Sequence, residues 1–159
     1  MKRYKYKHGV TLVEILVVVA IIAILATMVI GIAARISDQS KERGLESTFT
    51  LLESALQEYS EGTGKFPEQP EKNFANALIH SEYLYRELNL MPESRKILER
   101  ITESLLKNEY GTIDTPPEIY DPWGMVMDYI YVPGDNFPEL ISAGPDKIFG
   151  TADDISNNQ

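Results

Sequence analysis

The chain has 159 residues, of which 43% are hydrophobic and 25% are charged, and its formal net charge is −9. This length allows one domain, or one domain with a tail, and excludes a large multidomain enzyme. The excess of acids, 24 Asp and Glu against 15 Lys and Arg, argues against nucleic-acid binding, because phosphates need a surplus of cations on one face. The chain contains no cysteine, which excludes a disulfide scaffold and thiolate chemistry.

The first 34 residues combine a short basic segment with a long apolar one. Residues 1–9 carry four cations and no acid, and 18 of the 20 residues at 15–34 are hydrophobic. Twenty helical residues at about 1.5 Å each reach roughly 30 Å, which is enough to cross the hydrocarbon core of a bilayer. The run is too long for an ordinary secretory signal. We therefore expect a single-pass membrane anchor over residues 10–34, with the basic N-terminus in the cytoplasm and the rest of the chain outside.

Glu14 does not fit a plain membrane anchor. An unpaired carboxylate in a low-dielectric setting is costly, so it should be protonated, reach the interface or find a cation. Burial arguments alone leave two interpretations open, a functional role and a passive position at the depth of the headgroups.

Residues 9–14, Gly-Val-Thr-Leu-Val-Glu, resemble the processing signal of the type IV prepilin superfamily. The resemblance implies that a prepilin peptidase cleaves between Gly9 and Val10 and that the new amino group of Val10 is methylated. It also implies that Glu14 neutralises the N-terminal amine of a neighbouring subunit and so sets the axial register of assembly. Val10 departs from the Phe that this superfamily usually has at the first mature position.

The helical pattern continues beyond the apolar run. An apolar stripe is formed by Leu45, Phe49, Leu52, Leu56 and Tyr59, spaced 4, 3, 4 and 3 residues apart. No proline interrupts residues 10–59, so we expect one continuous helix of about 50 residues whose second half, 35–60, packs on its own globular domain. Two glycines and Pro67 then end the helix. This turn also resembles the one that closes the long helix in pilin-like subunits.

The middle of the chain predicts two more helices. Apolar residues at helical spacing indicate helices over 73–88 and 93–108. The stretch from Leu90 to Pro117 is longer than we expect in a pilin-like fold. It is either an insertion with its own contact surface or part of the internal packing, and the sequence does not separate the two.

From Tyr120 onward the pattern is that of β-structure. Residues 121–124, Asp-Pro-Trp-Gly, predict a turn, with Pro at the second position and Gly at the fourth. Residues 125–132 are rich in β-branched and aromatic side chains and predict a strand, and 139–143 predict a second one.

Three aspartates lie close together near the C-terminus. Asp146, Asp153 and Asp154 fall within nine positions, among glycines and a proline. Hard cations such as Ca²⁺ take about six to eight oxygen ligands, which a Gly-rich Asp loop supplies. The spacing is not the twelve-residue helix-loop-helix calcium pattern, and on spacing alone a solvated acidic turn is favoured.

The same region resembles the C-terminal part of the major pseudopilins of type II secretion systems. The segments that carry this resemblance are residues 121–124, 141–146 and 150–155. It implies a calcium ion with Asp146, Asp153 and Asp154 as side-chain ligands, completed by main-chain carbonyls near 140–143. Lys147 stands where that family usually has Gly.

Nothing in the sequence indicates an enzyme. His8 lies in the basic leader and His80 stands alone on a predicted helix, where a histidine is usually a surface or core residue. No Gly-rich phosphate loop and no nucleophile motif occurs.

These features together predict an α+β, pilin-like fold with a long N-terminal helix, a small head with extra helices and a short antiparallel sheet. The expected organisation is a leader at 1–9, a membrane and assembly segment at 10–34, a periplasmic half of the helix at 35–60 and a head at 61–159. The resemblance implies a structural subunit of a pilus-like filament in the inner membrane. Its expected partners are copies of itself, other pseudopilins, the prepilin peptidase and the inner-membrane assembly platform.

Two alternatives remain open. The first is a type IV pilin or minor pilin used for adhesion, motility or DNA uptake. Many such pilins close their C-terminal region with a disulfide, which this chain cannot form. The second is a membrane-anchored calcium-binding protein that never polymerises.

Overall fold

The computed structural model describes the backbone of residues 11–109 and 115–158, and all of their side chains except those of 28–35. Contacts divide the chain into two compact units, Met1–Gln39 and Ser40–Gln159. The expected leader at 1–9, and the expected cleavage site at Gly9 and Val10, lie outside the described residues.

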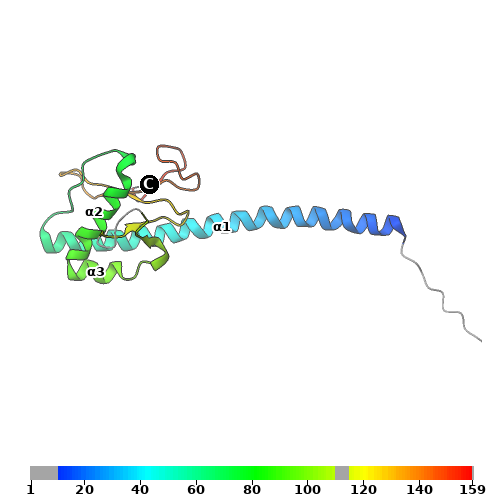
Figure 1. Ribbon diagram of the computed structural model, residues 1–159, viewed down its shortest axis with the longest axis horizontal. Helices are drawn as coiled ribbons and strands as arrows, with labels where there is room; N and C mark the ends of the chain where they lie inside the picture. Colours follow the sequence, from blue (N-terminus) through cyan, green and yellow to red (C-terminus); the bar gives the residue numbers. More distant parts are fainter. Residues whose placement is uncertain (1–10, 110–114, 159) are drawn as a thin grey trace, which may run out of the picture. The chain divides into compact units, whose positions relative to one another are not determined.

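The long helix α1, Leu12–Thr63, contributes to both units (Figure 1). This confirms the prediction of one continuous helix, which ends one turn later than expected. Its last turn is closed by the N–H of Gly64, which donates to the carbonyl of Ser60 at 2.8 Å, and Gly64 adopts a left-handed φ of 80°. In the described part of the chain, no helix combines the length and the apolar character needed to cross a membrane.

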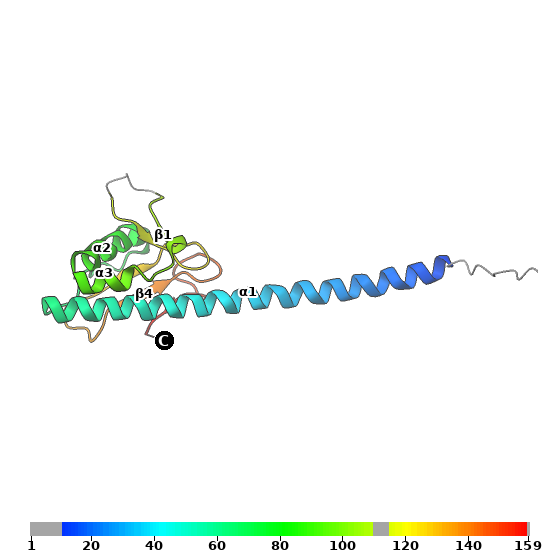
Figure 2. The ribbon, with the colours of Figure 1, turned by 90° about the horizontal axis from the view of Figure 1, so that it is seen from below.

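In the second unit, short helices and strands pack against the C-terminal half of α1. Helix α2, Ala77–Leu90, follows the 3-10 turn η1, Phe74–Asn76, and helix α3, Pro92–Leu98, begins two residues after α2 ends. Both helices lie beside α1 in the two perpendicular views (Figures 1 and 2). Pro92 occupies the first position of α3. The N–H of a residue at this position has no acceptor within the helix, so a proline, which lacks this N–H, is well suited to start α3.

The strands form two small antiparallel sheets. Strand β1, Leu106–Lys107, pairs with β2, Glu118–Ile119. The other sheet has the order β3-β4-β5, with β3 at Asp128–Ile130, β4 at Glu139–Ser142 and β5 at Ile155–Ser156. The predicted α+β class with a short antiparallel sheet is confirmed.

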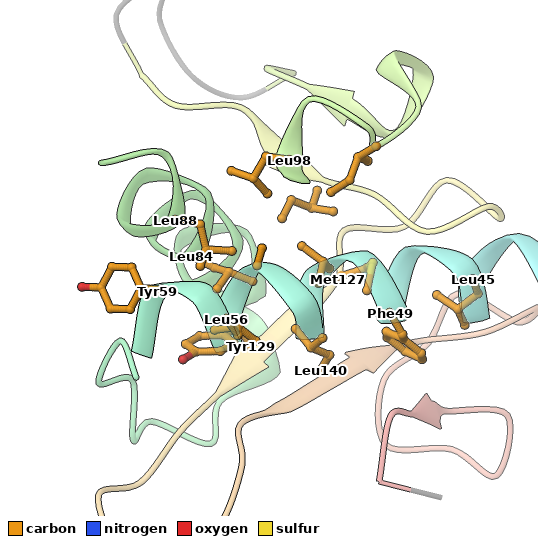
Figure 3. Close-up of a cluster of buried hydrophobic side chains, with 14 of the residues drawn as sticks. Leu45, Phe49, Leu56, Tyr59, Leu84, Leu88, Leu98, Met127, Tyr129 and Leu140 are labelled. Carbon is orange, nitrogen blue, oxygen red and sulfur yellow. The ribbon is translucent and has the colours of Figure 1, made fainter. Parts of the chain in front are cut away.

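The apolar stripe of α1 is the centre of the core. All five of its members are buried in one cluster. Figure 3 labels four of them, Leu45, Phe49, Leu56 and Tyr59, together with side chains from α2, α3, β3, β4 and the residue before β3. The labelled partners are Leu84, Leu88, Leu98, Met127, Tyr129 and Leu140. Burying one such side chain stabilises the fold by about 1.5–3 kcal/mol, so this stripe fixes the head on its helix.

The helix predicted over 93–108 is wrong beyond Leu98. After Leu98 the chain turns, with the N–H of Ile101 donating to the carbonyl of Leu98 at 2.9 Å, and a 3-10 turn η2, Glu103–Leu105, leads into β1. Leu98 and Ile101 are both buried although only the first is helical. Pairing of Leu106 with Ile119 requires extended backbone, and this tertiary contact prevails over the local helical spacing.

The strand predicted over 125–132 is shorter than expected. Only Asp128–Ile130 is continuous strand, and isolated bridges flank it, pairing Tyr120 with Val126 and Gln69 with Tyr131. The strand predicted over 139–143 is confirmed as β4.

Candidate assembly and calcium sites

The start of α1 is closed by a reciprocal pair of hydrogen bonds between Thr11 and Glu14. Oε2 of Glu14 accepts from the N–H of Thr11 at 2.8 Å and from its hydroxyl at 3.1 Å. In return, the N–H of Glu14 donates to Oγ1 of Thr11 at 3.3 Å. This is a capping box, in which a Thr and a Glu three residues later satisfy each other's backbone donors.

The capping box gives Glu14 a local role that the sequence interpretation missed. Thr-x-x-Glu before an apolar run is a recognisable signal for such a box, with Thr11 at the first position. The hydrogen bonds from Thr11 hold the carboxylate of Glu14 at the start of the helix. Because Glu14 is exposed, this carboxylate remains accessible. The expected neighbours Gly9 and Val10 lie outside the described residues.

The three predicted calcium ligands lie in the loop between β4 and β5. Oδ1 of Asp146 accepts from the N–H of Ile148 at 2.9 Å, and Oδ2 of Asp154 accepts from the N–H of Gly150 at 2.7 Å. The N–H of Asp153 donates to the hydroxyl of Thr151 at 3.3 Å. Two of the carboxylates thus fold the loop on its own backbone.

The donor chemistry of this loop suits calcium, but the conformation described does not present a closed site. Carboxylate and carbonyl oxygens are the ligands that calcium prefers. Within the described ranges, however, no three His, Asp or Glu side chains gather closely enough to hold a metal ion. The structure therefore places Asp146, Asp153 and Asp154 in one loop, but their side chains do not gather at one point.

Three residues of the loop have left-handed backbone, namely Gly144, Lys147 and Gly150. Gly144 has a φ of 65°, and a Cβ at this position would overlap the carbonyl oxygen of Asp153. Lys147 has a φ of 62° and is the only residue other than glycine with positive φ in the described chain. Because the left-handed region favours glycine, Lys147 adopts this conformation at a steric cost.

Asp121 makes two sets of hydrogen bonds, of which the sequence predicts only the first. It is 1% exposed, and its Oδ1 accepts from the N–H groups of Trp123 at 2.9 Å and Met125 at 2.8 Å, closing the predicted turn. Its Oδ2 accepts from the hydroxyl of Ser142 at 2.7 Å. An Asp at the first position of a Pro-containing turn predicts the first set of bonds. The bond to Ser142 joins residues 21 positions apart and has no local signal.

Comparison with known proteins separates the interpretations. Residues 4–30 match the prokaryotic N-terminal methylation motif. Over 159 residues the chain is 31% identical to the type II secretion system core protein G of Escherichia coli K12, which covers 99% of this chain and 94% of that relative. The chain belongs to the core protein G family of type II secretion systems.

Other members of the core protein G family are similar to the same degree. The relative from Klebsiella michiganensis is 31% identical over 157 residues, covering 98% of this chain and 95% of its own. The relative from Pectobacterium carotovorum is 29% identical over 153 residues, and the match covers 95% of this chain and 84% of that relative. The two resemblances seen in the sequence, to prepilins and to type II secretion pseudopilins, are thereby confirmed.

A solved structure is also similar. The crystal structure of the major pseudopilin from the type 2 secretion system of enterohaemorrhagic Escherichia coli matches with a TM-score of 0.40 and 19% identity, covering 76% of this chain and 84% of that one.

Proposed function

We propose that the chain is a structural subunit of the pilus-like filament of a type II secretion system, assembled through its N-terminal helix. The observation that carries the proposal is the likeness to core protein G over 94% of that relative's length, with the methylation motif at residues 4–30. The relatives are named as core proteins of a secretion system, which supports a structural role over a catalytic one.

In the proposed sequence of events, residues 1–9 stay in the cytoplasm while 10–34 lie in the inner membrane and the head faces the periplasm. A prepilin peptidase cleaves between Gly9 and Val10, and Val10 is methylated. The assembly platform then passes the subunit into a filament made of copies of itself and other pseudopilins.

The exposed surface of α1 supports assembly through the helix. All described side chains of residues 11–27 are exposed, and most of them are aliphatic. Outside the membrane, packing each large one against equivalent helices rather than leaving it in water contributes about 1.5–3 kcal/mol. The filament core is thus the place where this surface is covered.

Glu14 sets the register between subunits in this proposal. Both hydrogen bonds that Thr11 donates go to Oε2 of Glu14, so neither of them occupies Oε1. A carboxylate already ordered by the capping box loses less side-chain entropy when it pairs. The capping box is therefore compatible with the register role.

The cleavage step is tested by the mass of the chain in the presence of the prepilin peptidase. A Gly9→Lys variant should stay at the precursor mass, whereas a His8→Lys variant, which places the same side chain one residue earlier, should be trimmed. Removal of nine residues from the Gly9→Lys variant would overturn the cleavage proposal.

We further propose that the loop holding Asp146, Asp153 and Asp154 binds calcium. The support is the oxygen-rich donor set, together with a backbone that places the three residues in one loop. Calorimetric titration of the full chain in detergent should show calcium binding that Asp153→Ala abolishes. Asp135→Ala, at an exposed aspartate in another turn, is the control and should bind as the parent does. No heat with the parent chain would end this proposal.

A further inference from the structure

We infer that Asp121 and Ser142 are positioning residues of the C-terminal aspartate loop, residues 144–154, and that they connect this loop to the turn packed on α1. The consequence for calcium rests on the proposed function of the loop, whereas the connection itself rests on the hydrogen bonds and contacts below.

The first link is the side chain of Asp121. Both of its carboxylate oxygens are used, Oδ1 by the N–H groups of Trp123 and Met125 and Oδ2 by the hydroxyl of Ser142 at 2.7 Å. Asp121 and Ser142 are 1% and 0% exposed, so water does not compete for these bonds. A charge-assisted bond in such a setting has a defined geometry.

The second link is the hydroxyl of Ser142. While it donates to Asp121, its oxygen accepts from the N–H of Gly144 at 3.1 Å. Ser142 is the last residue of β4 and pairs with Ile155, the first residue of β5. The bond therefore acts at the point where the loop leaves the sheet and returns to it.

The third link is the close approach of Gly144 to Asp153. The carbonyl oxygen of Asp153 lies where a Cβ of residue 144 would be, and the left-handed φ of Gly144 makes this approach possible. A shift of Gly144 toward Asp153 would therefore displace Asp153, which is a proposed calcium ligand and the neighbour of another, Asp154.

The other end of this chain of contacts reaches α1. Pro122, which follows Asp121, lies next to Gly44 of α1. A Cβ on Gly44 would be in van der Waals contact with Cγ of Pro122, at 3.6 Å. Trp123 belongs to the same buried cluster as the stripe of α1. The order of contacts is thus α1, turn, Asp121, Ser142, Gly144 and Asp153. Through this series of contacts, the conformation of the loop depends on how the turn at residues 121–124 packs on α1.

Hydrogen exchange measured by mass spectrometry on the full chain in detergent tests the inference without calcium. Ser142→Ala removes the hydroxyl, and exchange within residues 144–154 should rise about tenfold, the loss expected for one buried hydrogen bond. Exchange in α2 should not change. Ser94→Ala is the matched control, because Ser94 is also 0% exposed and donates to the carbonyl of Ala55 at 2.9 Å, away from the loop.

Asp121→Asn is the second variant and keeps the test open if Ser142→Ala does not fold. The amide retains an acceptor for Trp123 and Met125 but turns a donor toward Ser142, so the loop should again exchange faster. The inference is overturned if both folded variants change loop exchange no more than Ser94→Ala does. In the calcium titration, both variants should bind about tenfold more weakly than the parent. Faster loop exchange in a chain whose parent binds no calcium would support the positioning role and end only the calcium proposal.

Discussion

Nδ1 of His80 lies 2.7 Å from Oδ1 of Asp128, and their side chains are only 4% and 0% exposed. His80 belongs to α2 and Asp128 to β3, so the pair ties the helix to the sheet across the core. The same Oδ1 accepts from the N–H of Tyr129 at 2.9 Å, and Nε2 of His80 lies 3.5 Å from Oε2 of Glu71. Burial raises the pKa of the Asp128 carboxyl, and its contact with His80 opposes that rise.

Removing His80 should destabilise the head strongly. A His80→Ala variant leaves Asp128 buried without its partner, which costs about 3–5 kcal/mol of unfolding free energy. Asp128→Asn should cost much less, because its amide oxygen still accepts from Tyr129 and His80. Urea unfolding followed by the fluorescence of Trp123, the only tryptophan, measures both. Equal losses for the two variants would contradict this account.

The raised pKa of Asp128 predicts a pH dependence with a definite sign. A folded-state pKa above the ordinary value of 3.8 means that the folded protein holds the proton more tightly than the unfolded chain. This contribution to stability is complete below 3.8 and is lost as the pH rises through the folded-state pKa. The unfolding free energy of the parent, relative to Asp128→Asn, should therefore decline from about pH 3 toward neutrality.

The control for this pH dependence is Asp135→Asn, which changes an exposed aspartate of the same sheet region. This variant keeps the Asp128 carboxyl, so its unfolding free energy relative to Asp128→Asn should also decline as the pH rises. A parent curve that rises relative to Asp128→Asn with increasing pH would refute the assignment.

Replacing Lys147 by glycine should stabilise the loop. The left-handed backbone costs a residue with a Cβ roughly 1 kcal/mol, which glycine avoids, so Lys147→Gly should raise the unfolding free energy by up to about that amount. Lys72→Gly removes the same charge from an exposed position without positive φ, and it should lower stability by about 0.5–1 kcal/mol. Thermal unfolding distinguishes the two signs, and a loss of stability in both variants would be against the prediction.

Two glycines of the loop should respond differently to alanine. Gly144 and Gly150 both have positive φ, but only Gly144 has the Asp153 carbonyl in the space of a Cβ. Both variants carry the backbone cost of about 1 kcal/mol, and Gly144→Ala adds a clash that must displace the loop. Denaturant unfolding should show Gly144→Ala to be clearly the less stable variant; similar losses would mean that the loop relaxes around residue 144.

Local patterns in the sequence predicted the elements that depend on local contacts. The 4-3 spacing from Leu45 to Tyr59 indicated the buried face of α1, and Asp-Pro-Trp-Gly indicated the turn at 121–124. In both cases the neighbours that determine the structure lie within a few residues. The Thr11–Glu14 capping box is equally local, because its two residues are three positions apart.

Contacts between distant residues could not be predicted in this way. Strands β1, β2 and β5 have two residues each and form only through their pairing. Two residues are too few to show a periodic pattern in the sequence. His80 and its partner Asp128 are 48 residues apart in the sequence, and Asp121 and Ser142 are 21 residues apart. The predicted calcium ligands do share one loop, but their geometry depends on where Gly144 is fixed, which the spacing of aspartates does not encode.

Crosslinking in membranes tests most directly whether the chain is a filament subunit. With the prepilin peptidase and assembly platform present, the parent chain should give a regular ladder of adducts, and Gly9→Lys should give none beyond the monomer. His8→Lys should give the same ladder as the parent. Monomer alone in the parent, under conditions where the leader is removed, would contradict the account and favour a membrane-anchored protein that does not polymerise.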